Sequence, residues 1–193
     1  MSVSLAKGQR LSLEKSGGGQ LTRVVMGLGW DASAKGLFGR RKSIDVDLDA
    51  SCLLFDARGA LVDQVWFQQL RSRDGSVTHT GDNRTGAGEG DDESIIVDLT
   101  AVPAAVTSLV FTVNSFTGQD FTQIENAFCR LLDAAGPQPT EIARYELSGS
   151  GKHNAQVMAK VARDGSGWAM TAIGAIATGR TVKDLVPAVV PFL

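Results

Sequence analysis

The sequence predicts a mainly β protein, a two-sheet β-sandwich with one or two short helices. Most of the chain alternates polar and apolar residues or runs in short apolar stretches, which is typical of strands. Glycine, asparagine and aspartate bound these stretches and favour tight turns. Hydrophobic residues make up 43% of the 193 residues, enough to fill a core, so we expect a single domain over residues 1–193.

Nine segments have the composition and length of strands. Two connections are predicted hairpin turns, ARGAL (57–61) and RDGSGW (163–168), because glycine supplies the positive φ that such turns need. Since most connections are short, two packed sheets are the economical arrangement. The expected strands are residues 10–14, 22–29, 44–55, 61–69, 94–99, 107–116, 140–147, 154–163 and 167–176.

Two segments are expected to be helical instead. In QIENAFCRLLDAAG (123–136), apolar residues recur every three or four positions and a glycine follows, which predicts an amphipathic helix packed on a sheet. The C-terminal TVKDLVPAVV (181–190) predicts a second, short helix. The segment DASAKGLFGRRKS (31–43) is expected to be a solvated loop, because a lone basic triplet is a common surface feature.

Charge and cysteine usage exclude several classes of protein. A net charge of -2 and a pI near 5.7 give no basic surface for nucleic acid, so no nucleic-acid partner is expected. Cys52 and Cys129 lie in apolar segments, where cysteine behaves as a small hydrophobic residue, so we expect two reduced core thiols. No stretch resembles a signal peptide or a membrane span, which predicts a cytoplasmic protein.

Carboxylates concentrate in two segments, of which the first is SIDVDLDAS (43–51). Asp45, Asp47 and Asp49 alternate there with apolar residues, so on a strand they share the face turned away from the core. Like charges about 7 Å apart along one strand repel each other unless a cation compensates them. No basic residue recurs nearby with a matching period, so a bound cation is the alternative.

The second acidic segment is TGDNRTGAGEGDDE (80–93), whose glycines let the backbone turn tightly. Oxygen ligands without histidine or cysteine suit calcium or magnesium and argue against zinc or copper. The spacing is not that of an EF-hand, because Ala50 stands where the loop starting at Asp45 would need glycine. Each segment alone is more commonly a solvated turn, but two together favour a metal. The ligand-type side chains of the second segment are Asp82, Asn83, Glu89, Asp91, Asp92 and Glu93.

The chain resembles the TerD family of bacterial tellurite-resistance and general stress proteins in three segments, GLGWD (27–31), DVDLDASCLLFD (45–56) and DGSVTHTGDNRTGAGEGDDE (74–93). The glycine-rich loop is the most specific of these. The similarity continues through VPAAVTSLVFTVN, FTQIENAFCRLLDAAG and EIARYELS, so it covers nearly the whole chain. The longer AKGLFGRRKS segment resembles the TerZ-like branch, and Ala87 stands where relatives often carry an acid.

The resemblance implies a β-sandwich that binds calcium through acidic loops, without an established catalytic activity. The expected function is a calcium-dependent scaffold or signalling module that meets other stress-response or tellurite-resistance proteins. A peripheral position at the inner face of the membrane and self-association are both left open. By position, the resemblance implies that the metal-binding residues are Asp31, Asp45, Asp47, Asp49, Asp82, Asn83, Glu89, Asp91, Asp92 and Glu93.

Two other functions stay open on the sequence alone. Metals held by carboxylates can drive phosphoester hydrolysis, which makes a metal-dependent phosphoesterase or nuclease the alternative. The two histidines, His79 and His153, lie in no recognisable acid–base motif, so we expect no enzyme. Direct tellurite chemistry would need Cys52 or Cys129, whose apolar settings predict poor reactivity.

Overall fold

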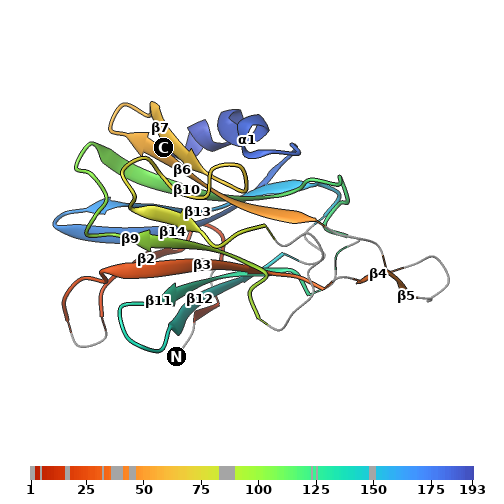
Figure 1. The fold of residues 1–193 in the computed structure, drawn as a ribbon, viewed down its shortest axis with the longest axis horizontal. Helices are drawn as coiled ribbons and strands as arrows, with labels where there is room; N and C mark the ends of the chain where they lie inside the picture. The colour runs from red at the N-terminus through yellow and green to blue at the C-terminus, as the bar shows by residue number, and fades with distance from the viewer. Residues whose placement is uncertain are drawn as a thin grey trace.

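Two six-stranded sheets face each other in a computed structural model of the chain (Figure 1). This architecture confirms the β-sandwich that the sequence predicts. Residues 3–4, 33–35 and 41–43 are described by their backbone alone. The structure describes residues 3–4, 6–15, 18–31, 33–35, 41–43, 47–82, 90–122, 124, 126–147 and 151–193.

The first sheet consists of β1 (Val3–Ser4), β3 (Arg23–Gly29), β8 (Val77–His79), β9 (Glu93–Asp98), β11 (Phe128–Asp133) and β12 (Thr140–Glu146). Its strand order is β1-β12-β11-β3-β9-β8. β1 runs parallel to β12, and the other described pairs are antiparallel. The ends of β8 and β3 and the start of β9 therefore meet at one end of the sandwich, where the acidic segments lie.

The second sheet consists of β2 (Arg10–Ser12), β6 (Leu48–Asp56), β7 (Leu61–Val65), β10 (Val106–Ser115), β13 (Ala155–Asp164) and β14 (Gly167–Ala177). Its strand order is β2-β14-β13-β10-β6-β7, with every described pair antiparallel. β6 joins β7, and β13 joins β14, through the two predicted hairpin turns. β6 lies between β10 and β7, so its backbone is paired on both sides.

The segment expected to be a loop over residues 31–43 contains a small ladder instead. β4 (Ser33–Lys35) pairs with β5 (Arg41–Ser43) in a separate two-stranded sheet. Backbone hydrogen bonds close such a hairpin whatever the side chains are, so the lack of apolar alternation in this segment gave no sign of it.

The C-terminal helix is confirmed as α1 (Val182–Val189), which continues into the 3-10 turn η1 (Val190–Phe192). The carboxylate of Asp184 accepts hydrogen bonds from the N–H groups of Arg180 and Thr181 and so caps the helix start. Figure 1 shows α1 against the outer face of the second sheet, where its apolar side packs on residues of β6, β10 and β13. No helix among the described residues combines the length and the apolar character that a bilayer crossing requires.

The helix predicted over residues 123–136 is wrong, because residues 128–133 form β11 between β3 and β12. Cys129 and Leu131 alternate into the core, as strand residues do. Asn126 has a φ of 50°, which takes the backbone out of any helical path just before the strand. Over so short a segment the apolar spacing fits both periods, and backbone pairing with two neighbouring strands decides the outcome.

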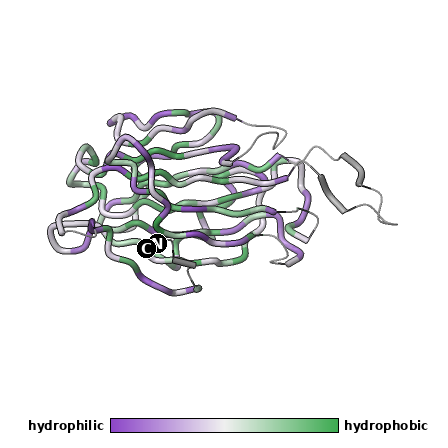
Figure 2. The backbone as a smooth tube through the Cα atoms, turned by 90° about the horizontal axis from the view of Figure 1, so that it is seen from below, coloured by the Kyte–Doolittle hydropathy of each residue, from purple (hydrophilic) through white to green (hydrophobic). Residues whose placement is uncertain are grey.

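Buried apolar side chains from both sheets fill the space between them. Leu28 and Ile95 of the first sheet and Leu48 and Phe111 of the second belong to one cluster. Figure 2 shows hydrophobic stretches within the strands, interrupted by hydrophilic residues. Cys52 and Cys129 are buried free thiols, as predicted.

Two glycines on β3 make room for Gly90 and Asp91, which lie against the outer face of the first sheet. A Cβ atom at Gly27 would lie 2.1 Å from Oδ2 of Asp91, and one at Gly29 would lie 2.6 Å from the carbonyl oxygen of Gly90. Any side chain at these positions would displace residues 90–91. The glycines of the GLGWD segment therefore allow residues 90–91 to lie close against β3.

We expect Gly29→Ala to lower the free energy of unfolding by about 2 kcal/mol, because the new methyl group meets both the backbone carbonyl of Gly90 and the ring of Phe128. Urea denaturation with an unchanged m-value would measure this loss. Gly136→Ala is the matched control, since its Cβ would find no atom nearer than 4.0 Å. Equal stabilities of the two variants would show that residues 90–91 shift freely.

Candidate metal centre

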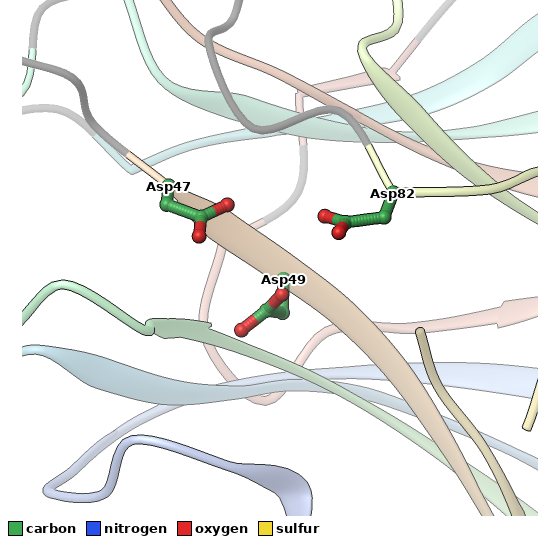
Figure 3. Close-up of side chains that lie close together, drawn as sticks. All are labelled: Asp47, Asp49 and Asp82. Atoms are coloured by element: carbon green, nitrogen blue, oxygen red, sulfur yellow. The ribbon is translucent and has the colours of Figure 1, made fainter. Parts of the chain in front are cut away.

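Three aspartates come together at one end of the sandwich. Asp49 lies on β6, Asp47 directly precedes that strand, and Asp82 follows β8. Each offers a carboxylate oxygen, and the three oxygens lie within 4.8 Å of one another. In Figure 3, the carboxylates of Asp47 and Asp82 point toward each other across the β6 strand that carries Asp49. Among the described residues, this is the group whose geometry could hold a metal ion.

The three carboxylates line a pocket of about 140 Å³ whose remaining described lining is aromatic, from Phe67 and Phe116. Asp47 and Asp49 are buried, whereas Asp82 is exposed at the mouth. The sequence places Asp47 and Asp49 away from the sandwich core, and they do lie there. Asp47 and Asp49 are nevertheless buried, because other parts of the chain cover the outer face of β6 at this end of the sandwich.

Burial, together with the negative charges of Glu93, Asp47 and Asp82, raises the pKa of Asp49 from 3.8 to about 8. The hydrogen bond that Nδ2 of Asn114 donates to Oδ2 of Asp49, at 2.8 Å, acts in the opposite direction. Without a cation in the pocket, Asp49 therefore holds a proton at neutral pH. The protonated carboxyl group of Asp49 can release this proton when a metal ion binds in its place.

A buried hydrogen-bond network behind the pocket fixes the two segments that carry these aspartates. The N–H of Ala50 on β6 donates to Oε2 of Glu93 on β9 at 2.8 Å, and Nε2 of His79 on β8 lies 3.3 Å from the same oxygen. The N–H of Gly81 donates to Nδ1 of His79 at 3.0 Å, which leaves the ring proton on Nε2. Ala50 adjoins Asp49 and Gly81 adjoins Asp82, so the network sets the position of both.

Glu93 thus lies behind the aspartates, fully buried and bonded to the backbone of β6. His79 bonds to both neighbouring segments and does not line the pocket. His153 is buried near Phe121, and burial lowers its pKa. Both histidines therefore have structural roles here.

Sequence reasoning missed Asn114, which joins the pocket to the helix. It stands opposite Asp49 in the pairing of β10 with β6, and it is fully buried. Its Nδ2 donates both to Asp49 and, at 2.7 Å, to the carbonyl oxygen of Arg180 just before α1. A polar residue inside the apolar run TSLVFTVNSF was the available signal, because a buried amide needs partners.

Asp91 lies on the outer face of the first sheet and already has a basic partner. Nε of Arg130 on β11 donates to its Oδ1 at 2.8 Å, and Arg130 also reaches Glu141 on β12 at 3.3 Å. The charge of Asp91 is therefore already offset by a base. Arg130 is 39 residues away in the sequence, so a search for nearby bases did not find it.

Asp92 and Asp31 lie close to Asp91 but bind other groups. The N–H of Trp30 donates to Oδ2 of Asp92 at 2.9 Å, and Nδ2 of Asn126 donates to Oδ2 of Asp31 at 2.6 Å. Burial raises the pKa of Asp92, and so do the charges of Asp91 and Asp31, against the Trp30 hydrogen bond. These three acids form a second, separate acidic group.

Four positions of the sequence analysis lie outside the described residues: Asp45, Asn83, Ala87 and Glu89.

The donor set of the pocket decides which metals fit. It consists of carboxylate oxygens, with no sulfur or imidazole ligand among the described residues. Such hard donors suit calcium or magnesium, and the irregular arrangement of one strand and one loop suits the tolerant geometry of calcium better than the strict octahedron of magnesium.

Comparisons with known proteins point to one family. The TerD domain family model matches residues 1–187. The tellurium resistance protein TerZ of Serratia marcescens is 47% identical over 188 residues, covering 95% of this chain and 94% of that protein. The stress response protein SCP2 of Bacillus subtilis is 37% identical over 199 residues, covering 96% of this chain and 98% of that protein.

The fold has been seen before as well. The crystal structure of a homologue of the telluride resistance protein TerD from Streptomyces coelicolor matches with a TM-score of 0.71 at 21% identity. The match covers 86% of this chain and 95% of that one. At this level of identity the likeness concerns the fold.

Without divalent metal, the free energy of unfolding should fall as the pH rises from about 4 to about 8. The folded protein keeps the Asp49 proton in this range, because its pKa is raised from 3.8, whereas the unfolded chain releases it. Asp49→Asn should remove this slope and be more stable than the wild type at pH 8, by on the order of 2 kcal/mol. Urea denaturation in chelator at several pH values measures both effects.

Asp164→Asn serves as control, since Asp164 is half-exposed and pairs with Arg10 away from the pocket. Its pH dependence should match that of the wild type. Parallel curves for the wild type and Asp49→Asn would contradict the assignment of a buried, protonated carboxyl group.

Proposed function

The chain belongs to the TerD family, and on that premise we propose that it is a calcium-binding stress-response protein of the tellurite-resistance type. It acts as a metal-dependent scaffold or signalling module. The observation that carries the proposal is the pocket of Asp47, Asp49 and Asp82. Relatives named for tellurium resistance and for stress response support the physiological part.

Calcium would be held by the carboxylates of Asp47, Asp49 and Asp82, and its charge would offset their repulsion. Asp49 would give up its proton as the ion enters, so binding is linked to pH. Because Asp82 lies on a loop and Asp49 on β6, a shared ion would tie the loop to the strand and stabilise the fold by mass action. Partners that recognise this tied loop would then sense calcium.

The surroundings of the pocket favour binding over catalysis. The described lining contains aspartates and phenylalanines, and His79 is held in the network behind it. Burial raises the pKa of the Cys129 thiol to about 12 and that of Cys52 higher still, so neither supports direct tellurite chemistry. If the protein hydrolysed a phosphodiester in the presence of magnesium or manganese, this result would instead support the alternative function, a metal-dependent phosphoesterase.

Its partners, on this proposal, are other stress-response or tellurite-resistance proteins in the cytoplasm, with peripheral contact at the inner face of the membrane and no nucleic acid. Self-association belongs to the same proposal and is measured by sedimentation with and without calcium. A pulldown that returns the same partners in calcium and in chelator would reduce calcium from a switch to a structural ion.

Calorimetric titration of metal-stripped protein with calcium should give a dissociation constant in the micromolar range or below, in the presence of millimolar magnesium. Asp82→Asn should weaken calcium binding at least tenfold, because it removes the charge of one of the three aspartate ligands. Asp82 is exposed, so this substitution should leave the fold intact. Asp164→Asn should bind as the wild type does. No heat, and no calcium-dependent rise in melting temperature, would refute the proposal.

A further inference from the structure

An arginine at the edge of the pocket is anchored to the residues that carry the aspartates. Nε of Arg180 donates to the carbonyl oxygen of Phe116 at 2.9 Å, and the N–H of Phe116 donates to the carbonyl oxygen of Asp47 at 3.0 Å. The carbonyl oxygen of Arg180 accepts from Nδ2 of Asn114, which also binds Asp49. Two short hydrogen-bonded chains thus fix Arg180 relative to Asp47 and Asp49.

The guanidinium of this arginine lies near an aromatic ring of the pocket lining. Its guanidinium carbon lies 5.7 Å from the ring centre of Phe116, which lines the pocket. In the part of the chain that the structure describes, no carboxylate lies within 4.0 Å of its guanidinium nitrogens. Arg180 is exposed, and its two terminal nitrogens carry further N–H donors besides the Nε that binds Phe116. Arg180 therefore offers an anion site next to the cation site.

Aromatic rings continue from this arginine to a second cation. Phe116 contacts Phe67 with ring centres 5.8 Å apart, and Phe67 contacts Trp66 at 4.8 Å. Nζ of Lys183 lies 5.0 Å from the Trp66 ring centre. The row of aromatic rings thus has a positive charge near each end, from Arg180 and from Lys183. These charges favour the approach of an anion.

Among the described residues that line the pocket, only the three aspartates offer side-chain oxygens to calcium. Calcium takes about six to eight oxygens, and three carboxylates supply at most about six, with both oxygens of each engaged. Phe67 and Phe116 offer no ligand atoms from their side chains. The pocket, at about 140 Å³, has room beyond the ion itself. An oxygen from a bound anion would complete the coordination.

We propose that the calcium-loaded pocket, together with Arg180, binds a phosphate monoester. A monoester has three terminal oxygens, so two can pair with the guanidinium fork while the third reaches calcium. A carboxylate or a phosphodiester has only two such oxygens and cannot give each of the three contacts an oxygen of its own. The inference rests on the proposed calcium function and adds the class of ligand that the same site recognises. Soluble phosphate esters and the phosphatidic acid headgroup share this chemistry.

Calorimetry with glycerol 3-phosphate tests the inference. Calcium-saturated wild type should bind it, and protein in chelator should not. Arg180→Gln should weaken binding at least tenfold while its calcium affinity, without phosphate, stays within about twofold. Arg180→Lys should fall between the two, because a single ammonium keeps the charge but loses the fork. Equal affinities of wild type and Arg180→Gln would overturn the inference.

Arg58→Gln is the matched control, an exposed arginine on the turn at the other end of β6, and it should bind as the wild type does. A normal calcium titration without any glycerol 3-phosphate heat would overturn this inference alone. Absence of calcium binding would overturn the proposed function and this inference together.

Sedimentation with vesicles separates the two sources of phosphate. Calcium-dependent, Arg180-dependent binding to vesicles containing phosphatidic acid, and none to phosphatidylcholine alone, would support recognition of a lipid headgroup. Binding of glycerol 3-phosphate without vesicle binding would support a soluble ester. Failure of both would overturn the inference.

Discussion

A hydrogen bond between the two sheets holds the acidic end of this sandwich in place. The N–H of Ala50 on β6 donates to the fully buried carboxylate of Glu93 on β9, and His79 binds the same oxygen. A buried carboxylate is costly unless its oxygens are bonded, so this network has a strong preference for one arrangement. Through it, the position of Asp49 on one sheet determines that of Asp82 on the loop leaving the other.

The pocket is built at the expense of stability. Three carboxylates gather where two of them are buried, and Asp49 keeps its proton because its charged form is poorly solvated. A fold selected only for stability would replace Asp49 with a neutral residue. The cost is explained if a cation occupies the pocket in the cell, because the same desolvation then strengthens the attraction between ligand and ion.

Much of this could be predicted from local pattern. Alternation along residues 44–55 placed Asp47 and Asp49 on one face, and a short C-terminal helix was expected and is present. Partners distant in sequence could not be predicted: Arg130 beside Asp91, Asn114 beside Asp49, and the strand β11 in place of a helix all depend on which strands become neighbours. Periodicity reports which face a residue occupies but carries no information about what lies across the sheet.

Both cysteines lie within the closed interior, where burial raises the pKa of each thiol. Oxidants attack the thiolate, which these side chains scarcely populate at neutral pH, and access to them is blocked by the sheets. Disulfide exchange and sulfenic acid formation are disfavoured for the same reasons. The protein can thus keep its fold in the presence of oxidants that attack exposed thiols.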